Sequence, residues 1–169
     1  MVVKDICINR DLLTSWLERL PGYNWSETSI HVLLNLADPQ DVPRMVKLLL
    51  CIIGLRKLDK NELDPSEAAK FEALCLLGQA FDALLQPFIN INYSLSQQIT
   101  SLAKFVHLIS GLYLNNSTSF LSNQLYGDFQ AVVKNAVLMV PKTHLIDPNL
   151  KVFICLLGDD VVKSLFGCV

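Results

Sequence analysis

Two adjacent carboxylates, Asp159 and Asp160, are the residues of this sequence best placed to do chemistry. They follow Gly158, between an apolar run and a short helical pattern. Adjacent carboxylates at such a junction can bind a divalent cation, which prefers hard oxygen ligands. The same residues can instead serve as a helix N-cap, which needs no metal. Lys163 opposes a bound cation electrostatically, so the pair is a weak metal candidate with capping as the alternative.

Other residue patterns offer no catalytic arrangement. The sequence has no CxxC pair, no interpretable Ser-His-Asp spacing and no glycine-rich phosphate loop, because its seven glycines are isolated. His31 has no second metal ligand one turn away, so it is expected to be a surface or core-edge histidine. His107 has no local carboxylate, so it is expected to be a hydrogen-bonded structural histidine. Five scattered cysteines in mostly apolar surroundings are typical of reduced thiols in an intracellular protein. We expect no catalytic residue and no cofactor.

The composition bounds the class of protein. The chain has 169 residues, of which 51% are hydrophobic and 18% charged, with a net charge of -2. These values predict one folded domain over residues 1–169, with no attraction to nucleic acid by this chain alone. The charged N-terminus lacks the apolar core of a signal peptide, and the longest apolar run, Leu48 to Leu55, is too short to span a membrane. An intracellular protein, cytoplasmic or nuclear, is expected.

Apolar residues three and four apart predict a mainly α fold, an irregular bundle of about six helices. The expected helices run from Asn9 or Asp11 to Leu20, from Ser26 to Leu34, from Val42 or Pro43 to about Leu58, from Pro65 to about Gln86, from Ser94 or Ser96 to about Asn115, and from Phe120 to Val140. Pro87 and Pro141 are expected to stop two of them, and Ser119 to cap the last. Gly78, inside the fourth, would let a neighbouring helix approach closely.

The C-terminal part of the chain is less regular. Residues 150–157, rich in Val, Phe, Ile and Leu between Pro148 and Gly158, allow one short orphan strand. A terminal helix from Asp160 to Phe166 would follow. An orphan strand exposes an unpaired edge, so homo-oligomerisation through residues 150–157 is expected.

The helix predicted from Phe120 to Val140 has two different faces. One is apolar, and the other carries amides and an acid. The polar set comprises Asn123, Gln124, Asp128, Gln130 and Asn135. Such a face is either a hydrogen-bonding platform for a partner protein or an ordinary solvated surface. Asn123, Gln124 and Asp128 are the partner-binding candidates.

The run SFLSNQLYGDFQAVVKNAV, followed by LLGDD and LFG, resembles open reading frames that recur in mushroom-forming fungi and derive from transposons. DVPRMVKLLLCIIGLRKLD and LDPSEAAKFEALCLLGQAF are similar to the upstream part of that family, so the resemblance covers nearly the whole chain. In the family, LLGDD precedes a Leu-Glu pair and the LFG, a pattern similar to Leu-Glu-x-x-Phe-Gly near the end of P-element-type transposases. The resemblance implies that this glutamate is the last carboxylate of an RNase H-like site with two divalent metals.

This sequence departs from the family at that position, where it has Val162 and Lys163. A lysine there removes a ligand and repels a divalent ion. The other carboxylates of such a site would lie before Met1. The expected function is therefore that of a non-catalytic helical remnant of a transposase-like protein, acting through protein binding. The alternative is a self-contained helical protein-interaction module, and a third hypothesis is a metal-dependent nuclease using Asp159 and Asp160.

Overall fold

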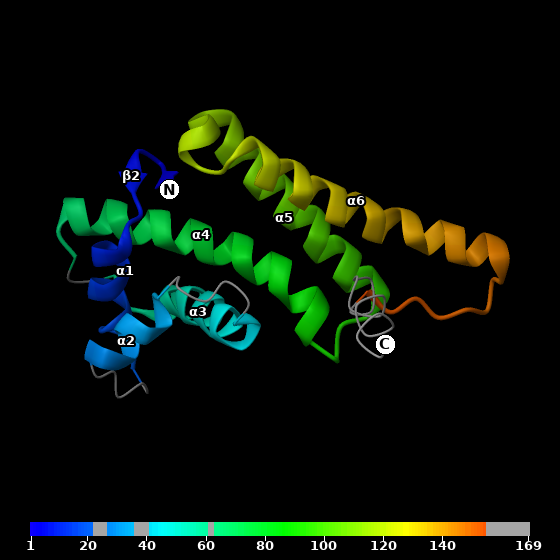
Figure 1. The fold of residues 1–169 in the computed structure, drawn as a ribbon, viewed down its shortest axis with the longest axis horizontal. Coiled ribbons are helices and arrows are strands. Elements are labelled where there is room, and N and C mark those ends of the chain that lie inside the picture. The colour runs from blue at the N-terminus through cyan, green and yellow to red at the C-terminus, as the bar shows by residue number, and fades with distance from the viewer. Residues whose placement is uncertain (22–26, 36–40, 61–62, 155–169) are drawn as a thin grey trace, which may run out of the picture. The chain divides into compact units, whose positions relative to one another are not determined.

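The computed structural model describes residues 1–21, 27–35, 41–60 and 63–154 of the chain. Over these residues the fold is mainly α-helical, which confirms the predicted class (Figure 1). The described α-helices are α1 (Arg10–Leu17), α2 (Glu27–Leu33), α3 (Val42–Gly54), α4 (Pro65–Ile89), α5 (Leu95–Asn116) and α6 (Asn123–Ile146), with short 3₁₀ helices η1 (Leu55–Lys57) and η2 (Ser117–Ser119). The predicted number of about six helices therefore agrees with the described part of the chain.

The chain forms two compact units. The first comprises Met1–Asp82 and Ser110–Ser122, and the second comprises Ala83–Ile109 and Asn123–Val169. Helices α4 and α5 each contribute one part to each unit. The single domain expected over residues 1–169 stays a prediction.

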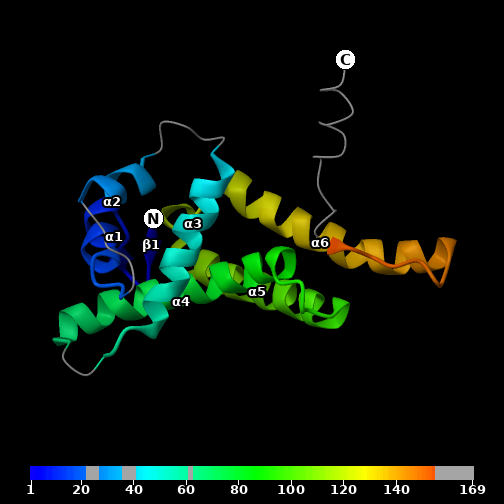
Figure 2. The same cartoon turned by 90° about the horizontal axis from the view of Figure 1, so that it is seen from below.

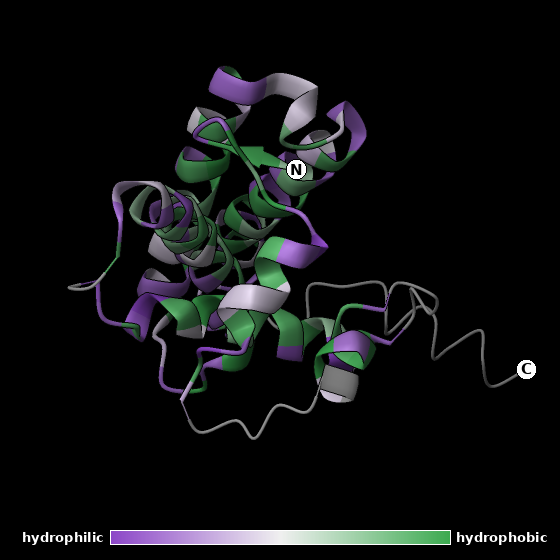
Figure 3. Cartoon of the chain, turned by 90° about the vertical axis from the view of Figure 1, so that its left-hand side faces the viewer, coloured by the Kyte–Doolittle hydropathy of each residue, from purple (hydrophilic) through white to green (hydrophobic). Residues whose placement is uncertain are grey.

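Stacked aromatic rings form the centre of the first unit. Trp16 of α1 and Phe71 of α4 have ring centroids 5.0 Å apart, and both side chains are buried. The Arg19 guanidinium lies 4.4 Å from the centroid of the Trp16 ring and also donates to Glu67 Oε1 at 2.7 Å. Hydropathy changes repeatedly along the helices here, as expected of elements with one buried face (Figure 3). Sequence-distant helices are thus joined by aromatic packing and a bridging arginine.

Helix α3 packs closely against α4 in the first unit, as both views show (Figures 1 and 2). A Cβ atom at Gly78 would lie only 3.0 Å from the carbonyl oxygen of Ile52. This confirms that Gly78 allows a neighbouring helix to come close. Arg56 and Asp82 join the same region by an ion pair, with 3.1 Å between Nη1 and Oδ2.

A small antiparallel sheet at the N-terminus was not predicted. Strands β1 (Val2–Val3) and β2 (Ile6–Cys7) pair in the register Val2 to Cys7 and Val3 to Ile6. Lys4 and Asp5 join them with φ angles of 48° and 62°, the left-handed conformation that a tight hairpin turn requires. Strands this short carry no alternation that a sequence pattern can reveal.

Helix α4 does not stop at Pro87, as predicted, but continues to Ile89. Proline has no N–H to donate to the carbonyl four residues earlier, which belongs to Ala83. The Ser101 hydroxyl of α5 donates to that carbonyl oxygen instead, at 3.0 Å. The proline is tolerated because a neighbouring helix replaces the missing hydrogen bond.

We expect Ser101→Ala to lower the free energy of unfolding by about 1 kcal/mol, because the part-buried Ala83 carbonyl loses its donor. Chemical denaturation followed by circular dichroism measures this loss. In a Pro87→Ala background the helix can supply its own N–H, so the same substitution should cost less there. An equal loss in both backgrounds would contradict this role for the hydroxyl.

Both predicted ends of the last long helix were wrong. Residues Ser117–Ser119 form η2, and Ser117 has a φ of 48°, so α6 begins at Asn123 rather than at Phe120 and Ser119 is not its cap. The helix also passes Pro141 and ends at Ile146. Because Pro141 has no N–H, the carbonyl of Val137 lacks its usual helical hydrogen-bond donor. Val137 is 40% exposed, so water can donate to this carbonyl instead.

The segment after α6 is not a strand where the structure describes it. Residues 151–153 have no regular structure, and Ile154 is a buried residue in a 3₁₀ turn. The orphan strand is therefore wrong for residues 150–154. Residues 155–157 and the terminal helix expected from Asp160 to Phe166 lie outside the described residues. A search of the described helices finds none with the length and apolar character needed to cross a membrane.

Candidate functional site

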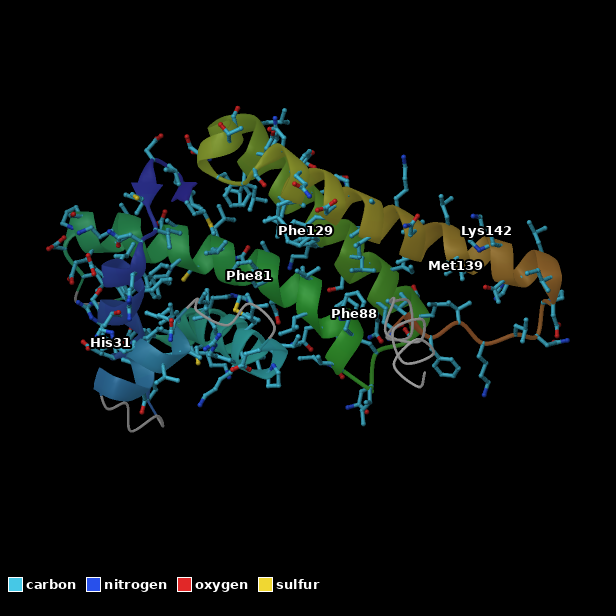
Figure 4. The ribbon with its side chains drawn as sticks, in the orientation of Figure 1. His31, Phe81, Phe88, Phe129, Met139 and Lys142 are labelled. Atoms are coloured by element: carbon cyan, nitrogen blue, oxygen red, sulfur yellow. The ribbon has the colours of Figure 1, made fainter. Side chains whose placement is uncertain are left out.

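Helix α6 packs against α5 in the second unit along one buried seam. Val133 and Ala136 of α6 are buried, and Phe129 meets Phe105 of α5 edge to face, with ring centroids 5.2 Å apart and an interplanar angle of 89°. Figure 4 labels Phe129, Met139 and Lys142 at successive positions along α6. The seam fixes the rotation of α6 about its own axis and so decides which of its residues face water.

A line of apolar residues on α6 lies outside the buried seam. Its members recur every seven residues and are 41%, 46%, 38% and 82% exposed; they are Leu125, Val132, Met139 and Ile146. Seven residues make almost two helical turns, so the line drifts by only about 20° per repeat. We call these four residues the apolar stripe. Exposed apolar side chains that share one line of a helix are a candidate interaction surface.

A row of polar residues borders the apolar stripe. It consists of exposed side chains spaced along α6, namely Gln124, Asp128, Asn135 and Lys142. We call this set the polar row, and the two sets together the outer face of α6. Two of the three predicted partner-binding residues, Gln124 and Asp128, belong to it. Asn123 is exposed too, but lies about 100° around the helix from Gln124, so it is not on the outer face.

A groove lies on the other side of the buried seam, between α5 and α6. It has a volume of ≈ 600 Å³ and is lined mainly by small and apolar residues, including Val106, Ala131, Val137 and Leu138. His107 also lines it and donates from Nδ1 to the carbonyl oxygen of Ala103 at 2.7 Å. The side chain is hydrogen-bonded, as predicted, while the structural role of His107 stays a prediction.

A second hollow of ≈ 560 Å³ lies in the same unit where the chain leaves α6. Its lining combines Phe88, Ile91, Tyr93 and Phe153 with His144 and Lys151. The aromatic and aliphatic residues dominate, while His144 and Lys151 supply the basic groups. This composition suits contact with an apolar or acidic group better than a proton-transfer reaction.

The side chains that could bind a metal or act as nucleophiles are scattered over the described residues. They contain no group of three or more His, Cys, Asp or Glu that could hold a metal ion. Burial raises the pKa of the Cys75 thiol, which keeps it protonated and a poor nucleophile at neutral pH. Cys51 is buried as expected of a core thiol, whereas Cys7 is exposed. The candidates Asp159 and Asp160, and the opposing Lys163, lie outside the described residues.

The His31 ring lies at the edge of the first unit. Its Nδ1 accepts a hydrogen bond from Arg10 Nη2 at 2.7 Å. The residue is exposed, as predicted for a surface or core-edge histidine.

The sequence pattern did not reveal the apolar stripe, because it placed Leu125 and Val132 on the same apolar face as Phe129, Val133 and Ala136. The structure divides them: Phe129, Val133 and Ala136 belong to the seam, whereas Leu125 and Val132 are exposed. The seven-residue spacing of the stripe is visible in the sequence. The predicted helix ended at Val140, so its range did not include Ile146, the last member of the stripe.

Comparison with known proteins gave no match to any protein-family model and no significant match to curated proteins or solved structures.

Proposed function

We propose that this chain is a non-catalytic helical protein that acts by binding protein, and that its contact surface is the outer face of α6. The observation that carries the proposal is the apolar stripe. Four large apolar side chains stand exposed in a line on a helix that is already packed against α5 along the neighbouring seam. Exposed apolar surface is costly unless something covers it, because its transfer from water is favourable.

The polar row supports the same proposal. A protein interface combines an apolar centre with a polar rim whose groups can form hydrogen bonds. Here Gln124 and Asn135 offer amides, and Asp128 and Lys142 offer charges, directly beside the stripe. This arrangement favours a helical partner that lies along α6, with its apolar side chains between those of the stripe.

The resemblance to transposon-derived frames supports descent of the chain from a larger transposase-like protein. In this proposal the helical part has kept its packing and its contact surface, while the position of the family's metal-binding glutamate is Lys163. A self-contained interaction module uses the same surface, so both histories lead to the same experiment.

A photo-reactive amino acid at position 132 tests the proposal in cells that express the full chain. Light should join the chain covalently to a protein at this position, because Val132 lies at the centre of the stripe. The matched control is the same substitution at Leu138, which is also 46% exposed and on the same helix but outside the outer face. We expect at least about fivefold more adduct from position 132.

Equal labelling from the two positions would show that exposure alone governs capture, and would contradict the proposal. Absence of protein adducts at position 132 would contradict it as well. Far-ultraviolet circular dichroism of both variants checks that each keeps its helical fold.

A further inference from the structure

The charges of the polar row are arranged with an internal symmetry. Asp128, Asn135 and Lys142 follow one another at intervals of seven residues, with an acid first, an uncharged amide in the middle and a base last. All three are exposed. Within the described part of the chain, neither Asp128 nor Lys142 forms an ion pair. The row is therefore complementary to itself when its direction is reversed.

We propose, resting on the proposed function, that the outer face of α6 binds the same face of a second copy of this chain, with the two helices antiparallel. In this arrangement Asp128 lies opposite Lys142 of the second copy, and Lys142 lies opposite its Asp128. The two Asn135 side chains meet at the twofold axis, where each amide can donate to and accept from the other. In a parallel twofold pair the two polar rows would lie on opposite sides of the contact, so Asp128 and Lys142 could not meet across it.

The apolar stripe fits the same register. When Asp128 is opposite Lys142, Val132 is level with position 138 of the second copy, one residue or about 1.5 Å from Met139, and Leu125 is level with position 145, one residue from Ile146. Every member of the stripe is then covered by another member. The seven-residue repeat is the spacing that lets two helices stay in contact by coiling gently around each other. One register thus brings the apolar and the charged positions together to within one residue.

The size of the outer face of α6 limits the expected affinity of the dimer. Helix α6 has 24 residues, so it is about 36 Å long. Contact along one face of a helix of this length is small for a protein interface, so a weak dimer that depends on concentration is expected. Other apolar residues of α6 are also exposed. The polar row runs beside the apolar stripe along the length of the helix. The second copy is therefore the partner that this surface matches by both chemistry and spacing.

Charge exchange in the full chain tests the proposal, with the dimer dissociation constant measured by sedimentation over a range of concentrations. Asp128→Lys alone and Lys142→Asp alone each turn two attractive contacts into repulsive ones, and each should weaken dimerisation about tenfold or more. The double variant Asp128→Lys/Lys142→Asp restores both attractions and should return to the wild-type value. An equal mixture of the two single variants should also form a dimer.

The control is Lys134→Asp, an exposed charge change on α6 outside the outer face. It should leave the dissociation constant within about twofold of the wild type. Val132→Asp places a charge in the middle of the stripe and should abolish the dimer. A monomeric wild type, single variants as strong as the wild type, or a double variant that stays weak would each overturn the antiparallel pairing.

The two proposals fail in distinguishable ways. If the chain sediments as a monomer but position 132 still cross-links to other proteins, the self-pairing is wrong and the protein-binding function stands. If the chain is a monomer and position 132 gives no adduct, both are wrong. Adducts whose mass is that of two copies, together with the charge-exchange pattern, support both.

Discussion

Phe71→Ala is expected to lower the free energy of unfolding by about 3–5 kcal/mol, enough to unfold much of a marginally stable domain. The Phe71 side chain has no exposed surface, and its ring stacks on Trp16 at 5.0 Å. Truncation leaves a cavity next to the Trp16 indole. It also removes the ring that faces the Lys60 ammonium, whose Nζ lies 5.6 Å from the centroid of the Phe71 ring. Urea denaturation followed by circular dichroism measures the loss.

Phe71→Leu is the matched control, because it keeps most of the volume and loses mainly the ring stacking. It should cost less than about 1.5 kcal/mol. The exposed Phe153, with 55% of its surface accessible, gives a second control, since Phe153→Ala should change the stability by no more than about 0.5 kcal/mol. A loss at Phe71 as small as that at Phe153 would contradict the packing described for the first unit.

Phe105→Ala should have an effect of similar size, about 3–5 kcal/mol, on the second unit. Phe105 is 1% exposed and provides the edge-to-face contact with Phe129 that holds α6 on α5. Its removal loosens the seam that fixes the rotation of α6. Amide hydrogen exchange should therefore become faster along α6, and cross-linking from position 132 should lose its preference over position 138.

Phe105→Leu separates packing from a specific aromatic contact. It fills most of the same space and should keep the exchange protection of α6, while losing the about 0.5–1.5 kcal/mol that an aromatic pair adds. If Phe105→Ala leaves the exchange rates of α6 unchanged, then the Phe105–Phe129 contact does not hold the outer face in place.

Helix ends show why local sequence rules succeeded for some elements and failed for others. Asp41 and Asp64 accept hydrogen bonds from backbone N–H groups three residues ahead, so their caps are local and were predictable. Pro87 was expected to end α4 by the same kind of local rule. The rule failed because the Ala83 carbonyl finds its donor in Ser101, fourteen residues beyond the proline. No pattern around Pro87 carries that information.

The sequence by itself determined the helical class, the starts of α3 and α4, and the close approach at Gly78, because periodicity, capping and side-chain size act within a few residues. It also placed polar candidates on the last helix, two of which lie on the outer face. Only the tertiary structure decided which apolar residues of α6 are buried, since packing of Phe129 on Phe105 fixes the helix rotation. That rotation leaves Val132 and Met139 in water, and so creates the surface from which function is inferred.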